Sequence, residues 1–521
     1  MSDLSAHRGT WWSDHRFLTL LLILSAVPLM WPPLPPLVDA AGHLSRYHIE
    51  TALADSPALQ RYFSFKWQLI GNLGVDLLIV PLSALMGLEA AFKLIVLTIP
   101  VLTSAGLILV SRAVNGRVTP FVAFALPLAY GFPFQFGFLN SCLATGLALI
   151  AFASWIELGK RGRQRSRGAL FVIVGALLWL CHVVGWAELG IMIAAYELSH
   201  ARSRGQPWGS AAVTAIRATV PLWPPIALML IWRSGEAAGD TTGWFNLGDK
   251  LSWLTDVFRE RWKYFDRGSA ALIAAVIIAS TALRRIGIAR DLGWVSILLL
   301  LTFIVVPFTL LGSDLADMRL APLVIGIALV ALKTPDDPRW ANAIAAGALL
   351  FFVARTAVVT FNFADYARGY REQLVALNHV PYGARVLVFA ATPCRDDWGD
   401  GRVEHLGGMA IVRRDAFTND QFALKGAQLL SIHHPAAGDF QHDPSQFIRT
   451  SACKTASEAI DDRSIPPYPS QEFDYMWLID FPGADRLRRP DLLRVWGRPD
   501  GALYRITSAG PADRELLLSA Q

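Results

Sequence analysis

Charged residues are scarce in this chain: they make up 17% of its 521 residues, whereas hydrophobic residues make up 53%. A soluble chain is about a quarter charged, so a wholly soluble protein is excluded. The scarcity is uneven along the sequence. Residues 1–360 hold 50 charged positions with a net charge of +8, and residues 361–521 hold 39 with a net charge of −3. A long membrane part is therefore followed by a part of soluble composition.

The chain has only four cysteines and no tract dominated by Pro or Gly, which excludes a disulfide scaffold, a collagen-like chain and a disordered chain. It contains no P-loop, dinucleotide-binding, Gly-x-Ser-x-Gly, His-Glu-x-x-His or Cys-x-x-Cys pattern. Cys142 and Cys181 lie in apolar segments and are expected to be buried thiols. Cys394 and Cys453 lie in the soluble part, where a disulfide and two free thiols are both open alternatives.

Long apolar runs are abundant before residue 361. A spanning helix needs about 20 mostly apolar residues, and we expect about 11 to 13 spans. The first follows Arg8 and Arg16 without a cleavage site, so a retained anchor is expected. The candidate spans lie near residues 17–34, 69–86, 90–110, 119–132, 136–158, 169–181, 183–198, 212–232, 268–283, 292–312, 318–333 and 340–360.

Three basic loops, at residues 160–167, 200–204 and 284–290, are expected on the cytoplasmic side. Full spans counted from a cytoplasmic N-terminus put residues 160–167 outside, so one segment must be re-entrant or half-length. The Pro- and Gly-containing stretch 127–140 is the expected break, because irregular backbone at membrane depth needs protein or water around it. The segments then expected on the outer side are residues 35–68, 234–267, 313–317 and 361–521.

Residues 361–521 are predicted to form a small α/β domain on the outer face. A helix is expected over residues 362–378, and short apolar runs predict strands. The predicted strands are residues 385–391, 408–412, 475–480, 493–496 and 502–506. The fold class is thus a polytopic α-helical membrane protein with a C-terminal extracytoplasmic α/β domain. His433, His434, His442 and Asp443 match no zinc spacing, so surface loops and no metal site are expected there.

The stretch after the first predicted span is the most informative. Four prolines within residues 32–36 end the membrane helix, and a new helix can begin near Asp39. Asp39, His43, Arg46 and Glu50 follow at spacings of four, three and four, which places them on one helical face. Two interpretations stay open: a charged stripe that meets a lipid-borne headgroup, or a solvated amphipathic helix with internal ion pairs.

Polar residues within apolar segments are costly in hydrocarbon and usually face a cavity or a partner. Asn72 and Asp76 are expected on one helical face of the second span. His182 and Glu188 are expected in two short helices that meet, and Asn140 follows the broken stretch. Each alone is equally well explained by a structural hydrogen bond. Together they favour a polar pocket that opens outward.

Cations that could hold a phosphate occur in two predicted outer loops. Arg259, Arg261 and Lys263 close the second long loop, and Asp317 and Arg319 lie in a tight turn. Arg and Lys side chains are the usual phosphate ligands. The alternatives are an interfacial basic and aromatic belt at residues 259–267 and a local ion pair in the turn.

This arrangement resembles the GT-C glycosyltransferases, which include the protein O-mannosyltransferases and the aminoarabinose transferase that modifies lipid A. The resemblance covers residues 1–360. It is carried by Pro35-Pro-Leu-Val-Asp39 with His43 and Arg46, by Tyr130-Gly-Phe and Gly137-Phe-Leu-Asn140, and by Ala316-Asp-Met-Arg319-Leu.

The resemblance implies transfer of a sugar from a polyprenyl-phosphate donor to an acceptor hydroxyl on the outer side of the membrane. The family's first-loop aspartate acts as general base, and Asp39 is the matching residue. His43 is expected to orient Asp39 or to contact the acceptor. Ala40 stands where many members have a second acidic residue. Some members bind a divalent cation, but this sequence has no carboxylate cluster for one, so no cofactor is expected.

The expected partners are the lipid-linked donor, a glycan, lipid or protein acceptor, and membrane lipids. The excess cations lie between apolar runs, so nucleic acid is not expected. A bacterial inner membrane with a cytoplasmic N-terminus and a periplasmic C-terminal domain is expected. Two other classes stay open: a transporter or flippase for lipid-linked sugars, although no repeat is found, and a non-catalytic envelope protein that binds or assembles glycan.

Overall fold

The computed structural model describes residues 10–233, 240–282, 286–310, 312–392, 398–399, 401–423, 428–448 and 465–507. The chain divides into two units. Unit 1 comprises residues 1–31, 69–78 and 94–361, and unit 2 comprises residues 32–68, 79–93 and 362–521. The loop predicted as the first outer loop therefore clusters with the C-terminal part of the chain.

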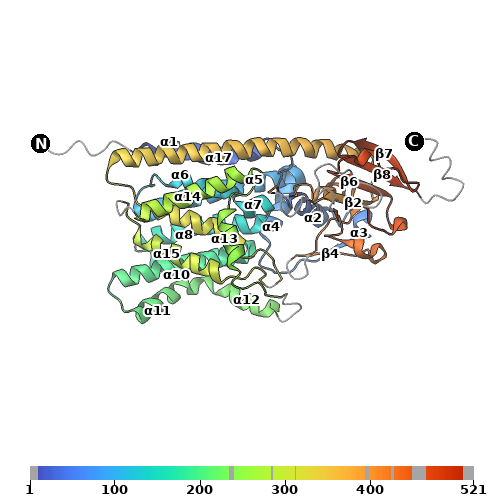
Figure 1. Ribbon diagram of the computed structural model, residues 1–521. Helices are drawn as coiled ribbons and strands as arrows, with labels where there is room; N and C mark the ends of the chain where they lie inside the picture. Colours follow the sequence, from blue (N-terminus) through green and yellow to red (C-terminus); the bar gives the residue numbers. More distant parts are fainter. Residues whose placement is uncertain are drawn as a thin grey trace. The chain divides into compact units, whose positions relative to one another are not determined.

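Helices make up unit 1, where α10 contacts α8, α11 and α15, and α16 contacts α15 (Figure 1). The helices that lie wholly or partly in this unit are α1 (His15–Met30), α4 (Gly74–Met86), α5 (Leu88–Asn115), α6 (Val122–Ala125), α7 (Phe132–Phe136), α8 (Leu139–Lys160), α9 (Gln164–Cys181), α10 (Val183–Ser203), α11 (Trp208–Thr219), α12 (Pro224–Arg233), α13 (Leu247–Thr255), α14 (Lys263–Ala282), α15 (Arg290–Val305), α16 (Ala321–Val330) and α17 (Pro338–Gln373). The turns η1 (Trp11–Ser13), η2 (Leu126–Tyr130), η3 (Val220–Leu222) and η4 (Met318–Leu320) accompany them.

Five segments within the described residues are helical, long and apolar enough to cross a membrane. They are Leu88–Asn115, Leu139–Lys160, Gln164–Cys181, Lys263–Ala282 and Pro338–His379, and shorter apolar helices accompany them. The protein is thus an integral membrane protein. The predicted class of a polytopic helical membrane protein followed by an α/β part is confirmed, and the count of about 11 to 13 spans stays a prediction.

Prolines and glycines set the breaks in the helices. The predicted break at residues 127–140 is confirmed: α6, η2 and α7 are short, and Gly137 ends α7 with a φ of 116°, which a residue without Cβ adopts at low cost. The single span predicted at 212–232 is wrong, because Pro221 and Pro224 separate α11 from α12. The span predicted at 292–312 ends early, at Val305, since Pro307 disfavours a helical residue before it.

The predicted helix over residues 362–378 is confirmed, but it is no separate element. It continues the last apolar helix, so that α17 runs unbroken from Pro338 to Gln373 and ends in the turn η5 (Leu374–His379). The chain thus passes from unit 1 to unit 2 within one helix.

Unit 2 contains a mixed sheet with strand order β3-β2-β6-β8-β7, and β5 also pairs with β2. Strand β2 is parallel to β3, β5 and β6, whereas β8 is antiparallel to β6 and β7. The apolar residues of β2 and β6 are buried in the core of the unit. The strands are β2 (Arg385–Ala391), β3 (Phe417–Thr418), β5 (Phe447–Ile448), β6 (Tyr475–Ile479), β7 (Leu492–Arg498) and β8 (Gly501–Ile506).

A second sheet joins the predicted first loop to the C-terminal part. Its strands β1 (Phe63–Phe65) and β4 (Leu430–Ile432) pair antiparallel, with Phe63 opposite Ile432. The helices α2 (Ala40–Ala52), α3 (Pro57–Gln60) and α18 (Met409–Arg414) also belong to unit 2, and α2 contacts α18. The turns are η6 (Leu406–Gly408), η7 (Pro435–Gln441), η9 (Ser470–Glu472) and η10 (Ala484–Arg486).

Four of the five predicted strands are found as β2, β6, β7 and β8. The strand predicted at residues 408–412 is wrong, because this segment forms the short helix α18. A short apolar run does not by itself distinguish a buried strand from a buried helix turn. Cys394, Cys453 and part of the basic loop 284–290 lie outside the described residues, and so does part of the loop 234–267. Cys181 is buried and Cys142 half-buried, both as free thiols.

Candidate functional site

Asp39 stands at the junction between the proline-rich stretch and α2, in unit 2. It occupies the N-cap position of α2, but its side chain forms no capping hydrogen bond with the helix. Arg402 supports this junction, because its guanidinium donates to the carbonyl of Pro36 at 2.7 Å. The Asp39 carboxylate therefore does not cap its own helix.

A histidine that the sequence analysis did not single out lies beside Asp39. The Nε2 atom of His405 is 3.7 Å from Oδ1 of Asp39 and 3.9 Å from Oδ1 of Asp443. The His405 side chain is only 6% exposed, and the Asp39 side chain 16%. The nearly buried imidazole therefore lies near two carboxylates, one from the segment 32–68 of unit 2 and one from its segment 362–521.

The other ring nitrogen of His405 fixes the protonation pattern. Its Nδ1 lies 2.8 Å from the backbone carbonyl oxygen of Asp420, and a carbonyl can only accept, so Nδ1 carries the proton. Burial lowers the pKa of His405, while the neighbouring Asp443 opposes that shift. Neutral His405 then presents the unprotonated Nε2 to Asp39, where the pair can accept protons from a substrate hydroxyl.

Asp420 holds this histidine in place and is itself buried. Its carboxyl accepts hydrogen bonds from the Thr418 hydroxyl at 2.6 Å and from the Gly408 amide at 2.7 Å. Burial raises the pKa of Asp420 to about 7 in spite of these bonds. The carbonyl that orients His405 thus belongs to a residue anchored to the turn η6.

The remaining residues of the predicted stripe lie along α2. His43 packs edge-on against Phe422, with ring centroids 5.3 Å apart, and the Arg46 guanidinium lies 4.5 Å from the ring centroid of Tyr47. Arg46 is 3% exposed and Glu50 is half-buried. Most residues of α2 are buried, and the Ser45 hydroxyl donates to the side-chain oxygen of Gln421. The alternative of a solvated amphipathic helix is therefore wrong.

The predicted polar residues of unit 1 converge partly on Asn140. Its Oδ1 accepts from the Val75 amide at 2.6 Å, and its Nδ2 donates to the carbonyl and the side-chain oxygen of Asn72 at 3.0 and 2.9 Å. The expectation that Asn72 shares a helical face with Asp76 is wrong, because α4 begins only at Gly74. Asn72 instead lies in an extended segment that hydrogen-bonds the junction of α9 and α10.

His182 and Glu188 are positioned by the same junction. His182 is the N-cap of α10, and its Nδ1 accepts from the Val184 amide at 3.1 Å. Glu188 is buried and accepts from the Thr145 hydroxyl at 2.7 Å. Asp76 is fully buried in α4. The expected meeting of two helices around residue 182 is confirmed, but these helices are not short, because α9 has 18 residues and α10 has 21. Both polar side chains have structural partners.

The predicted phosphate cations differ in their surroundings. Arg259 lies 5.1 Å from the ring centroid of Phe132, and Arg319 lies 4.1 Å from that of Phe138. Arg319 also donates to Ser313 at 2.9 Å. Lys263 is exposed and Arg261 half-buried at the start of α14.

Asp317 forms an ion pair that the sequence did not indicate. Lys250 lies 2.9 Å from it, and the two side chains are 4% and 2% exposed. Lys250 precedes Asp317 by 67 residues, which include α14 and α15, so no spacing rule links them. His405 and Lys250 were missed for this reason, because each is far along the chain from its partner and only the fold brings them close. Asp420 was missed because no motif marks it.

A metal site is not indicated by the described geometry. Within the described ranges no group of three or more His, Cys, Asp or Glu side chains is arranged to hold a metal ion. Metal independence stays a prediction. His434, expected in a surface loop, is buried beside Phe417 with ring centroids 4.7 Å apart, so that part of the expectation is wrong.

No protein-family model and no curated protein matches the chain. Two solved structures are similar to it. One is the arabinofuranosyltransferase AftD from mycobacteria, with 15% identity, a TM-score of 0.45 and coverage of 95% of this chain and 40% of AftD. The other is ArnT from Cupriavidus metallidurans bound to undecaprenyl phosphate, with 12% identity, a TM-score of 0.44 and coverage of 95% and 98%.

This chain thus spans 40% of the length of AftD and nearly all of ArnT. Both similarities concern the fold alone.

Proposed function

We propose that this protein is an integral-membrane glycosyltransferase that moves a sugar from a polyprenyl-phosphate donor to an acceptor hydroxyl, with Asp39 as general base. The observation that carries the proposal is the setting of Asp39. Its carboxylate makes no capping bond to α2 and lies 3.7 Å from Nε2 of His405 in a mostly buried position. A carboxylate held in this way suits proton removal from a hydroxyl.

In the proposed reaction the acceptor oxygen attacks the anomeric carbon of the donor sugar from the face opposite the phosphate. The new carbon–oxygen bond forms as the bond to the phosphate oxygen breaks, and its electron pair leaves with the phosphate. The acceptor proton passes to Asp39. General-base help of this kind contributes about 10²–10⁴-fold. The anomeric centre is inverted.

His405 acts on Asp39 in this proposal. While His405 is neutral, its Nε2 lone pair disfavours further negative charge nearby and keeps Asp39 basic. If His405 takes up a proton, the imidazolium pairs with Asp39 and makes it a weaker base. His43, one turn along α2, contacts the acceptor.

The leaving phosphate needs compensation of its charge. Arg259, Arg261, Lys263 and Arg319 remain the predicted ligands for it, and Arg46, Glu50, Asn72, Asp76, Asn140, His182, Glu188 and Asp317 remain predicted substrate contacts. We place the reaction at the periplasmic side of a bacterial inner membrane, with a glycan, lipid or protein as acceptor.

The test offers purified protein in nanodiscs a panel of polyprenyl-phosphate sugars together with envelope extract as acceptor source. Release of free polyprenyl phosphate is followed by mass spectrometry for the wild type and for Asp39→Asn. We expect release from one donor, its loss in the variant, and donor binding in both. Release that is equal in both proteins would remove Asp39 from the mechanism. Absence of release from every donor would favour transport or glycan binding instead.

A further inference from the structure

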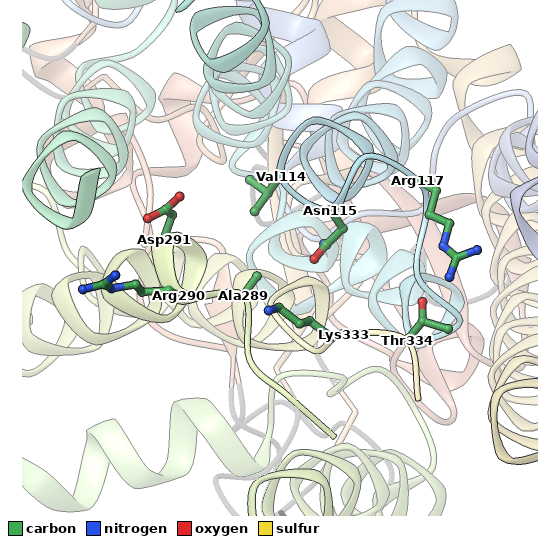
Figure 2. A pocket seen from close by; sticks show the side chains of 8 residues that line it. All are labelled: Val114, Asn115, Arg117, Ala289, Arg290, Asp291, Lys333 and Thr334. Atoms are coloured by element: carbon green, nitrogen blue, oxygen red, sulfur yellow. The ribbon is translucent and has the colours of Figure 1, made fainter. Parts of the chain in front are cut away.

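A pocket of about 470 Å³ lies at one end of unit 1, among helix ends that the proposed reaction does not use. Figure 2 shows Asn115 above Lys333 at the middle of the pocket, with Arg117 and Arg290 at opposite ends. Its volume falls in the range of small-ligand sites, about 300–1,000 Å³. Its lining residues are Val114, Asn115, Arg117, Ala289, Arg290, Asp291, Lys333 and Thr334.

Short-range contacts hold the helix ends around this pocket. The Asn115 amide donates to the carbonyls of Ser111 and Val330, at 3.1 and 3.4 Å, which ties the end of α5 to the end of α16. The Ala289 amide donates to the carbonyl of Ala331 at 2.7 Å and joins the start of α15 to the same place. The pocket is therefore formed by packed helix ends rather than by one loop.

The lining is strongly cationic. Arg117, Arg290 and Lys333 come from three separate segments, and Asp291 is the one carboxylate beside them in the pocket lining. Asp291 accepts a hydrogen bond from the Ser199 hydroxyl at 2.6 Å. Within the part of the chain that the structure describes, no carboxylate forms an ion pair with these three cations. An excess of two positive charges is left without an internal partner.

A neutral group of the pocket suits the same kind of ligand. The Thr334 hydroxyl adds a hydrogen-bond donor beside the cations. Arg117 also lines a neighbouring hollow of about 770 Å³ together with Arg112 and Asp14. Guanidinium and ammonium groups with a hydroxyl nearby are the side chains that bind phosphate oxygens.

We infer that this pocket binds the phosphate group of an anionic ligand, either the headgroup of an anionic phospholipid or a soluble phosphate. The inference is independent of the proposed transferase reaction. It is drawn from the net excess of two positive charges at one cavity where apolar helices end. Basic pockets between membrane helices commonly receive lipid headgroups.

The test uses the full-length protein in a neutral detergent. Binding of dioctanoyl phosphatidylglycerol, dioctanoyl phosphatidylcholine and inorganic phosphate is measured by native mass spectrometry and by microscale thermophoresis. The variant Arg117→Gln/Arg290→Gln/Lys333→Gln removes the three cations. The matched control Arg161→Gln/Arg163→Gln/Arg165→Gln removes the same charge from exposed residues between the end of α8 and the first turn of α9.

We expect phosphatidylglycerol to bind, phosphatidylcholine to bind more weakly, and affinity to fall by about fivefold for each cation removed from the pocket. The control triple variant should lose little affinity for phosphatidylglycerol. Binding of inorganic phosphate alone, with the same dependence on the pocket variant, would assign a soluble phosphate as the ligand. Equal losses in the two triple variants, or no binding of any anion by a wild type that unfolds cooperatively, would overturn the inference.

Discussion

The backbone carbonyl of Asp420 accepts a hydrogen bond from Nδ1 of His405 at 2.8 Å, and this contact decides which nitrogen of His405 faces Asp39. A free histidine side chain exchanges between two tautomers. Here one tautomer is selected by a main-chain group, which mutation of the Asp420 side chain leaves in place. The acid–base behaviour of Asp39 is therefore linked to a turn far along the sequence.

Replacement of His405 should change how transfer depends on pH. Because burial lowers the pKa of His405, the residue is neutral at pH 7 and becomes charged only below its ordinary range. We expect wild-type kcat to fall on that acid side, as the imidazolium weakens Asp39 as a base. His405→Gln should lower kcat by about 10²-fold and lose this acid limb.

The control for this experiment is His433→Gln, which changes an exposed histidine of the same unit whose ring contacts Ser64. It should keep the rate and the pH profile of the wild type. If His405→Gln merely lowered the amount of folded protein, the rate would fall equally at every pH, and the acid limb would be retained.

Asp420 should make unit 2 less stable as the pH rises. Its pKa is raised to about 7 in the folded state, from an ordinary value of 3.8. The folded protein therefore binds more protons than the unfolded chain between these values, and stability falls with rising pH across that window. In Asp420→Asn this contribution is absent. We expect the Tm of the variant minus that of the wild type to increase between pH 4 and 7.

The measurement is thermal unfolding in detergent at several pH values, with Asp439→Asn, at an exposed position of η7, as the control. A Tm difference that stays constant with pH would mean that the Asp420 carboxyl keeps its ordinary pKa. The lowered pKa of His405 makes stability rise with pH, which is the opposite direction. This contribution is present in wild type and variant alike, so the Tm difference between them removes it.

Asp415 should be important for the packing of α2 and α3 against the C-terminal part of unit 2. Its two carboxylate oxygens accept hydrogen bonds from His48 Nε2 and from the Ser56 hydroxyl, each at 2.8 Å. Its φ of 48° also lies in the left-handed region, which Asp and Asn tolerate better than Ala. We expect Asp415→Ala to lower the free energy of unfolding by about 1–3 kcal/mol, and Asp415→Asn to lower it less.

Chemical denaturation followed by tryptophan fluorescence measures this loss. The pair of variants at one position separates the backbone effect from the hydrogen bonds. Equal losses of unfolding free energy in Asp415→Asn and Asp415→Ala would show that the carboxylate charge matters for stability and that backbone strain at residue 415 does not.

The buried pair of Lys250 and Asp317 should respond differently to single and double replacement. Lys250→Met leaves the Asp317 carboxylate buried without its cation, which should cost about 3–5 kcal/mol. Lys250→Met/Asp317→Leu removes both charges and should recover most of the loss. A double-mutant cycle from unfolding in detergent measures the coupling, with the exposed Lys263→Met as the control. If the losses of unfolding free energy in the two single variants simply add in the double variant, the interaction between Lys250 and Asp317 contributes nothing to stability.

The elements set by local sequence could be predicted. The prolines after Met30 mark the end of α1, and the alternation around Val386 and Met476 predicts β2 and β6 at nearly their observed bounds. The helix α2 and the position of Asp39 at its start were also predicted, because the prolines before Asp39 and the helical spacing after it act within a few residues.

The partners of Asp39 could not be predicted in this way. His405 follows no motif, and the apolar run at residues 408–412 suggested a strand rather than the turn and helix that follow His405. Lys250 lies in the predicted outer loop 234–267, yet it is buried against Asp317. In both cases the signal is a long-range contact, which periodicity does not contain.

The pairing of β1 with β4 has a consequence for synthesis of the protein. Residues 63–65 leave the ribosome early, whereas their partners at 430–432 are made after the helices of unit 1. At ~5–20 residues per second, the interval lasts on the order of tens of seconds. During it the edge of β1 and the apolar side of α2 have no cover from the C-terminal residues that enclose them in the finished protein. A chain that stops before residue 430 lacks the partner strand of β1 altogether.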